Sequence, residues 1–221
     1  MSISSEAEAL RWLGEQHGDA MERLVGLVSA LRAENERQNL VSRPSLESVW
    51  QRHIVDSAQL LHVSRETVPD GPWLDLGSGA GFPGLVIAAL QPERRVTLVD
   101  SRRLRTEWLL RAAAGMGLAN VEVVLSRVED LVDRTWSVIS ARAFAPLGRL
   151  LDVAGRFSTP ETLWLLPKGA KAQHELDELG PDWNRVFHVE QSLTDPSAGI
   201  IVGHLYGRTG RNASSKRGSG R

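Results

Sequence analysis

A short acidic and glycine-rich segment carries the clearest chemical signal in this sequence. Trp73-Leu74-Asp75-Leu76 has the composition of a buried strand and runs directly into Gly77-Ser78-Gly79-Ala80-Gly81-Phe82-Pro83-Gly84. Glycines at the carboxyl end of a buried strand let the main chain turn tightly and approach a ligand. Asp100 lies about 20 residues after Gly79, where a carboxylate can accept hydrogen bonds from both hydroxyls of a ribose. Together these residues predict a site for an adenosine-type ligand.

The spacing of the glycines fits two kinds of ligand. The last three glycines satisfy G-x-G-x-x-G, the dinucleotide fingerprint, whereas the first three, with Asp75, satisfy D-x-G-x-G-x-G, typical of S-adenosylmethionine-dependent methyltransferases. Pro83 favours the second ligand, because a pyrophosphate at a helix start needs free N–H groups and proline has none. We therefore predict S-adenosyl-L-methionine as the cofactor, with a nucleotide-binding oxidoreductase as an alternative. Asp75 is expected either to anchor the amides of the loop or to contact the methionine ammonium.

The composition fits a folded domain that does no cysteine chemistry. Of the 221 residues, 42% are hydrophobic and 24% are charged, which excludes disorder for most of the chain. The absence of cysteine excludes disulfides, thiolate metal sites and covalent thiol adducts. The six histidines are scattered without ligand spacing, so no metal is expected. Because the formal net charge is −1, a nucleic-acid surface would have to be a local patch.

No segment has the character of a signal or a membrane span. The first 20 residues lack an apolar core, and the longest wholly apolar run, Leu85–Leu90, has six residues. A helical span needs roughly 20 apolar residues. We therefore expect a cytoplasmic protein without membrane contact.

Three helical patterns precede the glycine loop. Ser5 and Glu8 form a capping-box signature ahead of the first pattern, and Asp19 and Glu22 repeat it ahead of the second. A third pattern starts near Pro44 and runs to residue 61. Residues 1–70 are therefore predicted to form a helical extension packed on the core.

From residue 72 onward, short apolar runs alternate with helix-length segments at 83–90, 104–116 and 147–157. This alternation predicts an α/β fold over residues 71–206, with a mostly parallel seven-stranded sheet and helices on both faces. The connection between the last two runs is short, so these strands are expected to pair antiparallel. Residues 207–221 contain Gly, Ser and basic residues and are predicted to be a disordered tail. The expected strands are Trp73–Leu76, Val96–Val99, Val121–Leu125, Trp136–Ser140, Thr162–Leu166, Val186–Val189 and Ile200–Leu205.

Six short motifs follow one another along the chain in a distinctive order. In order and spacing they resemble the RsmG (GidB) family, bacterial methyltransferases that modify N7 of a guanine in 16S ribosomal RNA. The resemblance covers roughly residues 20–205 and implies a Rossmann-like class I S-adenosylmethionine-dependent methyltransferase. The motifs are N-L-V-S at 39–42, R-H-I-V-D-S at 52–57, L-D-L-G-S-G-A-G-F-P-G at 74–84, S-R-V-E at 126–129, R-A-F-A-P-L at 142–147 and P-K-G at 167–169.

The resemblance also implies which residues contact the cofactor. Carried over motif by motif, the contacts fall in the glycine loop, after the third strand and after the fourth strand; the loop glycines and the acid after the second strand complete the predicted set. That set is Gly77, Gly79, Gly81, Phe82, Asp100, Val128, Glu129 and Arg142.

The predicted reaction needs alignment more than acid–base chemistry. N7 of guanine offers an exposed lone pair from which no proton must be removed, so no catalytic base is expected. Alignment of nitrogen, methyl and sulfur can supply roughly 7 to 11 kcal/mol. Arg142 follows a buried strand, where an unpaired guanidinium is costly, so it is expected to face the methionine carboxylate or an RNA phosphate. Lys168 is a second candidate contact to the substrate.

Binding of RNA is expected to come from basic patches. Arg102, Arg103, Arg105 and Arg111 lie on the predicted second helix of the α/β domain, and the tail after residue 207 is wholly basic in its charge. The predicted partner is 16S ribosomal RNA or the small ribosomal subunit, and the protein is expected to be a monomer. A methyltransferase of the same fold acting on a small molecule is the alternative. Two interpretations stay open for the cluster of Arg52, His53, Asp56 and Ser57, a functional group or a polar seam.

Overall fold

One mixed sheet of seven strands runs through the molecule, a computed structural model that describes residues 2–62 and 68–205. The strand order is β3-β2-β1-β4-β5-β7-β6. Neighbours from β3 to β5 pair parallel, and β7 pairs antiparallel with both β5 and β6, which confirms the predicted α/β class and the antiparallel end. The strands are β1 (Trp73–Leu76), β2 (Val96–Asp100), β3 (Val121–Leu125), β4 (Val138–Ala141), β5 (Leu163–Gly169), β6 (Phe187–Gln191) and β7 (Gly199–His204).

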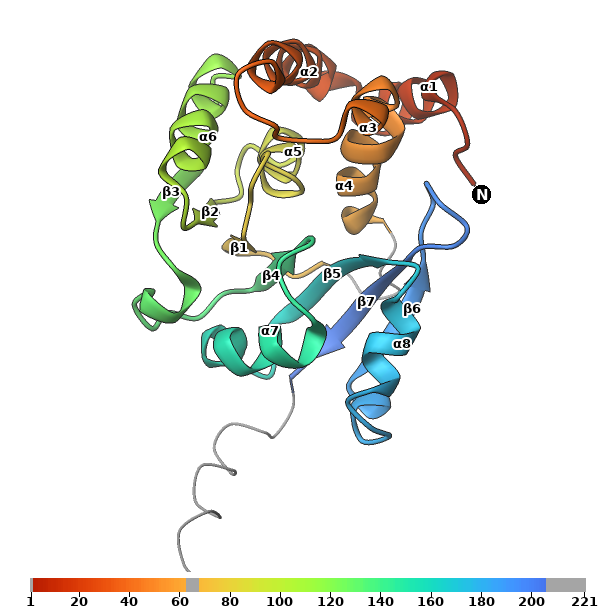
Figure 1. The fold of residues 1–221 in the computed structure, drawn as a ribbon, viewed down its shortest axis with the longest axis vertical. Coiled ribbons are helices and arrows are strands. Elements are labelled where there is room, and N and C mark those ends of the chain that lie inside the picture. The colour runs from red at the N-terminus through yellow and green to blue at the C-terminus, as the bar shows by residue number, and fades with distance from the viewer. Residues whose placement is uncertain (1, 63–67, 206–221) are drawn as a thin grey trace, which may run out of the picture.

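Helices cover both faces of this sheet (Figure 1). On one face lie α4 (Asp56–Ala58), α5 (Gly84–Leu90) and α6 (Arg103–Gly115), and on the other lie α7 (Leu147–Ala154) and α8 (Ala172–Asp177). Two hydrophobic clusters fill the two spaces, and the alternation along each strand divides its side chains between them. The sequence did not predict α8, because its six residues are mostly polar and present only two buried side chains.

The N-terminal helices pack outside the first helical layer (Figure 1). They are α1 (Glu6–His17), α2 (Met21–Asn35) and α3 (Arg43–Glu47). Ser5 caps α1 as predicted, since its hydroxyl accepts the Glu8 N–H at 3.3 Å. The second predicted capping box is wrong. A 3-10 turn over Gly18–Ala20 joins α1 to α2, so α2 begins after Ala20 without a side-chain cap.

The third helical pattern, expected as one helix from near residue 44 to residue 61, is broken. After α3 the chain forms a π-helix over Trp50–Val55, continues as α4 and ends in a 3-10 turn over Gln59–Leu61. At the start of the π-helix, the N–H groups of Trp50 and Gln51 donate to the Glu6 carboxylate of α1 at 3.2 and 2.8 Å. A π-turn is wider than an α-turn and often occurs at functional sites. Here it carries the R-H-x-x-D-S motif.

The N-terminal segment is fastened to the connection between β6 and β7. The Ile3 N–H donates to the Leu193 carbonyl at 2.7 Å, and the Gln51 amide bridges the carbonyls of Ile3 and Thr194 at 2.9 Å each. Distant parts of the chain therefore meet at the carboxyl edge of the sheet. The predicted tail, residues 207–221, lies outside the described residues. Within the described part, no helix has both the length and the apolar character of a membrane span.

Candidate functional site

The glycine loop between β1 and α5 adopts a backbone that side chains disfavour. Gly77, Gly79 and Gly81 have φ values of 67°, 55° and 99°. A Cβ atom at Gly77 would lie 2.6 Å from the ring of Phe144, so glycine also permits a close approach there. Glycine is therefore favoured in this loop for two reasons: the positive φ values, and the close approach of Phe144, which follows β4, to Gly77.

Asp75 is completely buried beneath this loop. Its carboxylate accepts the Gly84 N–H at 3.3 Å and the Ser140 hydroxyl at 2.7 Å, and the Trp73 indole donates to the same hydroxyl at 2.8 Å. Burial raises the pKa of Asp75 to about 6, although the hydrogen bonds from Ser140 and Gly84 act in the opposite direction and lower this pKa. These contacts place Asp75 as an anchor at the start of α5, whereas contact with a methionine ammonium stays a prediction.

Asp100 closes the loop from the end of β2. One carboxylate oxygen accepts the Gly79 N–H at 3.0 Å, and the other accepts the Arg102 N–H at 2.9 Å. The side chain is 4% exposed, yet it lines a cavity of 710 Å³. The oxygen that accepts from Gly79, Oδ2, keeps a second lone pair for a ligand hydroxyl, whereas Oδ1 also accepts the Arg102 Nε–H at 3.4 Å.

This cavity, called here the Asp100 cavity, collects most of the sequence motifs after the glycine loop. Its lining includes Gly77, Asp100, Val128 and Glu129 of the predicted cofactor contacts, together with residues 143–146. Gly79, Gly81 and Phe82 are not among its lining residues, so their contact with a ligand stays a prediction. Volumes of this size are usual for sites that bind cofactors.

Val128 and Glu129 reach the Asp100 cavity from a 3-10 turn after β3. Val128 is buried against the core, and Glu129 is exposed. The carbonyls of both residues accept hydrogen bonds from the Arg156 guanidinium, at 2.9 and 3.0 Å. Arg156 therefore fixes the turn through its two carbonyls, a role that the sequence motif S-R-V-E did not indicate.

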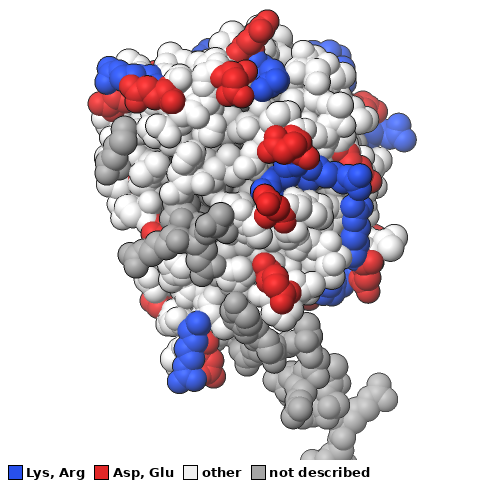
Figure 2. All heavy atoms as spheres, turned by 180° about the vertical axis from the view of Figure 1, so that it is seen from behind, with Lys and Arg blue, Asp and Glu red and all other residues white. Residues whose placement is uncertain are grey.

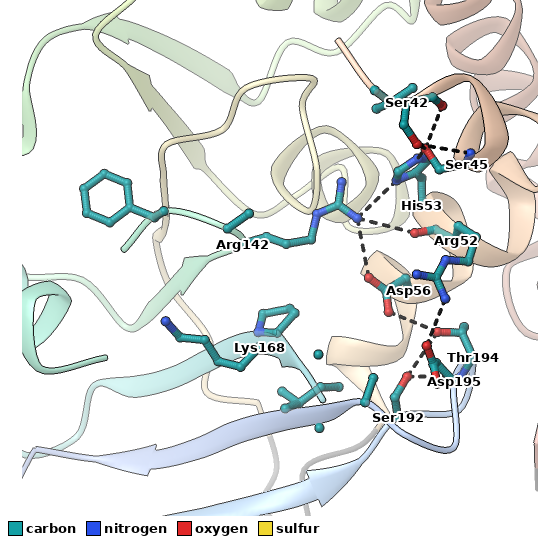
Figure 3. Close-up of a pocket in the computed structure, with 18 of the residues that line it drawn as sticks. Ser42, Ser45, Arg52, His53, Asp56, Arg142, Lys168, Ser192, Thr194 and Asp195 are labelled. Atoms are coloured by element: carbon teal, nitrogen blue, oxygen red, sulfur yellow. Dashed lines mark hydrogen bonds and ion pairs between the residues drawn. The ribbon is translucent and has the colours of Figure 1, made fainter. Parts of the chain in front are cut away.

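A second cavity of 690 Å³, called here the Arg142 cavity, lies on the other side of residues 143–146. Its lining comes from five separate parts of the chain: residues 40–56, the segment after β4, the end of β5, α8, and the connection from β6 to β7. Figure 3 shows Arg142 and Lys168 on one side of it and Ser42, His53, Asp56 and Thr194 on the other. Residues 143–146 line both cavities and form the wall between them.

A buried ion pair supports this shared wall. The Lys168 ammonium donates to the Ala145 carbonyl at 2.6 Å and lies 3.0 Å from the Glu175 carboxylate. The same Glu175 oxygen accepts the Leu147 N–H at 2.8 Å. The Lys168 side chain is 6% exposed, and its ammonium is engaged by Ala145 and Glu175. Its predicted contact with substrate stays a prediction. Ala143 has a φ of 51°, which marks strain at the same wall.

Arg142 points toward the residues of the R-H-x-x-D-S motif (Figure 3). Its Nη1 donates to His53 Nδ1 at 3.1 Å, to the Arg52 carbonyl at 3.4 Å and to the Asp56 carboxylate at 3.5 Å. The guanidinium also lies 5.1 Å from the centre of the Phe82 ring. Burial lowers the pKa of Arg142, although Asp56 opposes that shift. Arg142 lines the Arg142 cavity and is not among the lining residues of the Asp100 cavity.

His53 is held neutral in one tautomer. Arginine can only donate, so His53 Nδ1 must accept, and Nε2 then carries the proton that it donates to the Ser45 hydroxyl at 3.0 Å. Burial and the charges of Arg142 and Arg52 lower the pKa of His53 to about 3. The ring stacks on Phe82 with centroids 4.9 Å apart. The sequence left the role of this motif open, and the structure shows it contacting both the glycine loop and the Arg142 cavity.

The predicted basic patch on α6 is largely engaged within the protein. Arg105 donates to the Asn39 carbonyl at 2.6 Å, and Arg111 pairs with Glu34 at 2.9 Å. Arg102 and Arg103 keep side chains that are 63% and 77% exposed. Arg127 and Arg149 also reach the rim of the Asp100 cavity, and no sequence motif singled them out for binding RNA.

Several residues that line the Arg142 cavity belong to no sequence motif. Ser45, Thr194 and Asp195 belong to segments with little apolar periodicity, and only the tertiary contacts bring them together. Within residues 2–62 and 68–205, no three His, Cys, Asp or Glu side chains are grouped so that they could hold a metal ion.

Comparisons with known proteins identify the family of this chain. Residues 20–196 match the model of the GidB family, rRNA small subunit methyltransferase G. A relative from Novosphingobium aromaticivorans, ribosomal RNA small subunit methyltransferase G, is 67% identical over 93% of this chain and 90% of its own length. Its counterpart from Erythrobacter litoralis is 56% identical over 94% of this chain and 100% of its own.

Solved structures resemble the fold at low sequence identity. A fibrillarin/Nop5p complex matches with a TM-score of 0.53 and 14% identity, over 71% of this chain and 82% of that chain. A variant of MtNAS in complex with S-adenosylmethionine matches with a TM-score of 0.52 and 16% identity, over 79% of this chain and 72% of that one. The chain therefore belongs to the GidB family, rRNA small subunit methyltransferase G, and has the fold of class I S-adenosylmethionine-dependent methyltransferases.

Proposed function

We propose that this protein transfers a methyl group from S-adenosylmethionine to N7 of a guanine in the 16S RNA of the small ribosomal subunit. The observation that carries the proposal is the pair of cavities that share the wall of residues 143–146. One cavity is bounded by the glycine loop and Asp100 and suits the donor. The other opens beside it and suits an acceptor.

The residues around the Asp100 cavity fit S-adenosylmethionine better than a dinucleotide. Asp100, at the end of β2, offers the carboxylate oxygen Oδ2, which accepts only the Gly79 N–H, for a ribose hydroxyl. Pro83 precedes α5 and supplies no N–H, so a pyrophosphate would find a weak partner there. Val128 gives apolar contact for an adenine, and the turn that holds Glu129 is fixed by Arg156. The predicted contacts with Gly77, Gly79, Gly81, Phe82 and Arg142 belong to this proposal.

The chain's own residues would contribute alignment to the reaction. Bound S-adenosylmethionine supplies an electrophilic methyl group on a sulfonium. Guanine N7 needs no proton removed, and His53, the buried histidine of the Arg142 cavity, has a pKa of about 3 and accepts from Arg142, so it is no general base. Residues 143–146 line both cavities and are held by Lys168 and Glu175, so they would fix the place where donor and acceptor meet in line.

Local basic residues support contact with RNA at the rim of the Asp100 cavity. Arg102 and Arg127 have side chains 63% and 67% exposed, and Arg149 is exposed beside them. Away from this rim the surface is mixed, since Figure 2 shows basic and acidic residues interspersed over the rear face. We further propose that the protein acts as a monomer, as its sequence suggests, and that it is cytoplasmic, because ribosomal RNA is its proposed substrate.

The decisive experiment is transfer of labelled methyl to small ribosomal subunits from a strain that lacks the enzyme. Label in the 16S RNA, mapped to N7 of one guanine, is the expected result. Label confined to a small-molecule fraction would favour the alternative substrate class. Titration with S-adenosylhomocysteine and with NAD provides the second arm, because saturable binding of NAD alone would support an oxidoreductase and overturn the proposal.

A further inference from the structure

The proposed donor contacts lie on both sides of the wall of residues 143–146. Gly77 and Asp100 line the Asp100 cavity, whereas Arg142 lines the Arg142 cavity. In S-adenosylmethionine the ribose and the methionine carboxylate stand at opposite sides of the sulfur. A donor that binds through its ribose at Asp100 and through its carboxylate at Arg142 must therefore extend from one cavity into the other.

Arg142 keeps the donors that a carboxylate needs. All three of its hydrogen bonds use Nη1, and Nη2 and Nε have no hydrogen-bond partner among the described residues. These two groups form one edge of the guanidinium, and such an edge binds a carboxylate through two parallel hydrogen bonds. The side chain is 21% exposed, so a ligand can reach it. The proposed contact with the methionine carboxylate therefore needs no change at Arg142 itself.

The ring of Phe144 stands on the path between Asp100 and Arg142. Phe144 lines both cavities and packs on Gly77, where an added Cβ atom would lie only 2.6 Å from Cδ2 of the ring. The methyl group that is transferred is bound to the sulfur, in the middle of the donor. A donor that reached Arg142 would bring this sulfur to the boundary between the cavities, where the ring now lies.

The main chain after Phe144 is fastened, but the ring itself has few partners. The Lys168 ammonium holds the Ala145 carbonyl at 2.6 Å. Phe144 is half-buried at the margin of the hydrophobic cluster that includes α7 and α8, and no aromatic pair among the described residues includes it. Ala143, directly before it, has a φ of 51°, and such strained residues are concentrated in segments that switch between two arrangements. The ring can therefore turn while the wall keeps its place.

We propose that the ring of Phe144 is a gate that S-adenosylmethionine displaces when it binds. The methionine part of the donor takes the place of the ring at Gly77 and reaches Arg142, and the ring turns toward the Arg142 cavity, the other cavity that it lines. This role rests on the proposed function, which supplies the donor and its contacts. The displacement brings the methyl group to the cavity that suits the acceptor, whereas a closed gate would leave the wall between them.

Removing the ring should strengthen the binding of a ligand that carries the methionine part. In the wild-type protein the closed gate lowers the apparent affinity for S-adenosylhomocysteine, because only the open arrangement can bind it. We expect Phe144→Ala to bind S-adenosylhomocysteine about three to ten times more tightly, by calorimetry. 5′-Methylthioadenosine has the same nucleoside and a thioether but no carboxylate, so its affinity should stay within about twofold of wild type.

Trp183→Ala is the matched control for the loss of an aromatic ring. Trp183 is also half-buried against the cluster that includes α7 and α8, but it lines neither cavity, so both affinities should stay at their wild-type values. A weaker affinity of Phe144→Ala for S-adenosylhomocysteine would make the ring a contact that holds the donor. Equal gains for S-adenosylhomocysteine and 5′-methylthioadenosine would place the effect of the ring at the nucleoside. Either result would overturn the proposal.

Fluorine NMR follows the ring directly. The chain has four phenylalanines, so labelling with 4-fluorophenylalanine gives four signals, and Phe144→Leu identifies the signal of Phe144. Saturating S-adenosylhomocysteine should shift this signal, and 5′-methylthioadenosine should shift it less, because only the first ligand displaces the ring. A Phe144 signal that S-adenosylhomocysteine leaves in place would refute the gate, whatever the affinities of the variants.

The gate and the proposed function fail in different ways. If the affinities and the fluorine signal of Phe144 change as expected but no ribosomal subunit is methylated, the proposed acceptor is wrong and the gate stands. If subunits are methylated at guanine N7 but S-adenosylhomocysteine neither shifts the Phe144 signal nor binds Phe144→Ala more tightly, the gate fails alone.

Discussion

The Asp100 cavity and the Arg142 cavity share the wall of residues 143–146 but differ in the kinds of groups that form them. Beside the Asp100 cavity lies the glycine loop, whose glycines have positive φ, and backbone N–H groups of Gly79 and Arg102 bind the Asp100 carboxylate. The Arg142 cavity is made of side chains from five parts of the chain, joined in three ion pairs. A ligand contact made by main chain depends on local conformation, whereas contacts by paired side chains depend on tertiary assembly.

This difference implies that the two cavities should respond to different substitutions. Changes of backbone freedom in the glycine loop should affect donor binding, and changes of charge beside residues 143–146 should affect the wall or the acceptor. The following predictions, ordered by the size of the expected effect, test that division.

Gly79→Val should remove donor binding almost completely. A Cβ at Gly79 would meet only the Gly77 carbonyl oxygen at 3.6 Å, so the protein interior has room, but the φ of 55° and the ligand space do not suit a branched side chain. We expect affinity for S-adenosylhomocysteine to fall at least about 1,000-fold, on the order of 4 kcal/mol, by calorimetry.

Gly117→Val is the matched control for this change. Gly117 follows α6 with a φ of 66°, and a Cβ added there would have nothing within 4 Å, so it carries the same backbone penalty away from both cavities. It should lose about 1–2 kcal/mol of stability and keep donor affinity. Equal losses of affinity in both variants would mean that backbone strain, and not the loop, sets donor binding.

Asp75→Asn should change how stability depends on pH. The folded protein raises the pKa of Asp75 from 3.8 to about 6, so between these values the unfolded chain has released the proton and the folded protein retains it. Stability of the wild type should therefore fall relative to the variant as pH rises from 4 to 7, by roughly 3 kcal/mol.

Urea unfolding of both proteins at several pH values measures this difference. Repeating the series with saturating S-adenosylhomocysteine sharpens it. An unchanged pH-dependent difference would support Asp75 as an internal anchor, whereas a smaller difference would reveal contact between Asp75 and the ligand's ammonium. A constant difference between the two proteins at all pH values would contradict the raised pKa.

Lys168→Met should act on the wall and not on the donor. Removing the ammonium leaves Glu175 without its partner and frees the Ala145 carbonyl. We expect a loss of about 2 kcal/mol in the free energy of unfolding, at the low end for a buried pair because Glu175 is 18% exposed and keeps its bond to the Leu147 N–H.

The activity of Lys168→Met gives the second readout. Methyl transfer should slow through a lower kcat, because residues 143–146, which line both cavities, lose the support that aligns donor and acceptor, while affinity for S-adenosylhomocysteine stays within a few-fold. An increase in KM for subunits with unchanged stability would instead make Lys168 a direct contact to RNA, as the sequence suggested.

Removal of residues 208–221 should have the smallest effect. This segment lies outside the described residues, but its basic composition predicts contacts to phosphate that contribute affinity without sequence preference. Binding to small subunits should weaken less than about tenfold at low salt. The slope of log affinity against log salt concentration should become less steep, by about 0.7 to 0.9 for each lost contact to phosphate. Identical salt curves for the two proteins would assign no RNA contact to the segment.

The glycine loop, Asp100 and the alternating strands were predictable from the sequence because each depends on neighbours along the chain. The strand Trp73–Leu76 was placed at its observed bounds, and Ser5 was identified as a cap. The helix predicted from near residue 44 to residue 61 failed where a long-range contact intervened: Glu6 of α1 binds the N–H groups of Trp50 and Gln51 at the start of the π-helix. Periodicity alone gives no sign of such a contact.

The sequence by itself determined the class of the fold, the family and the kind of donor, because buried strands and the conformational freedom of glycine are local properties of the chain. Only the tertiary structure decided which way Arg142 points, which proton His53 carries and that Lys168 supports a wall. Those outcomes depend on groups that are far apart in the chain. A buried side chain and its partners determine whether a neighbouring side chain is charged and which of its donors and acceptors stay free. The physical reason is that hydrogen bonds and ion pairs of buried side chains are satisfied by whatever the fold brings near.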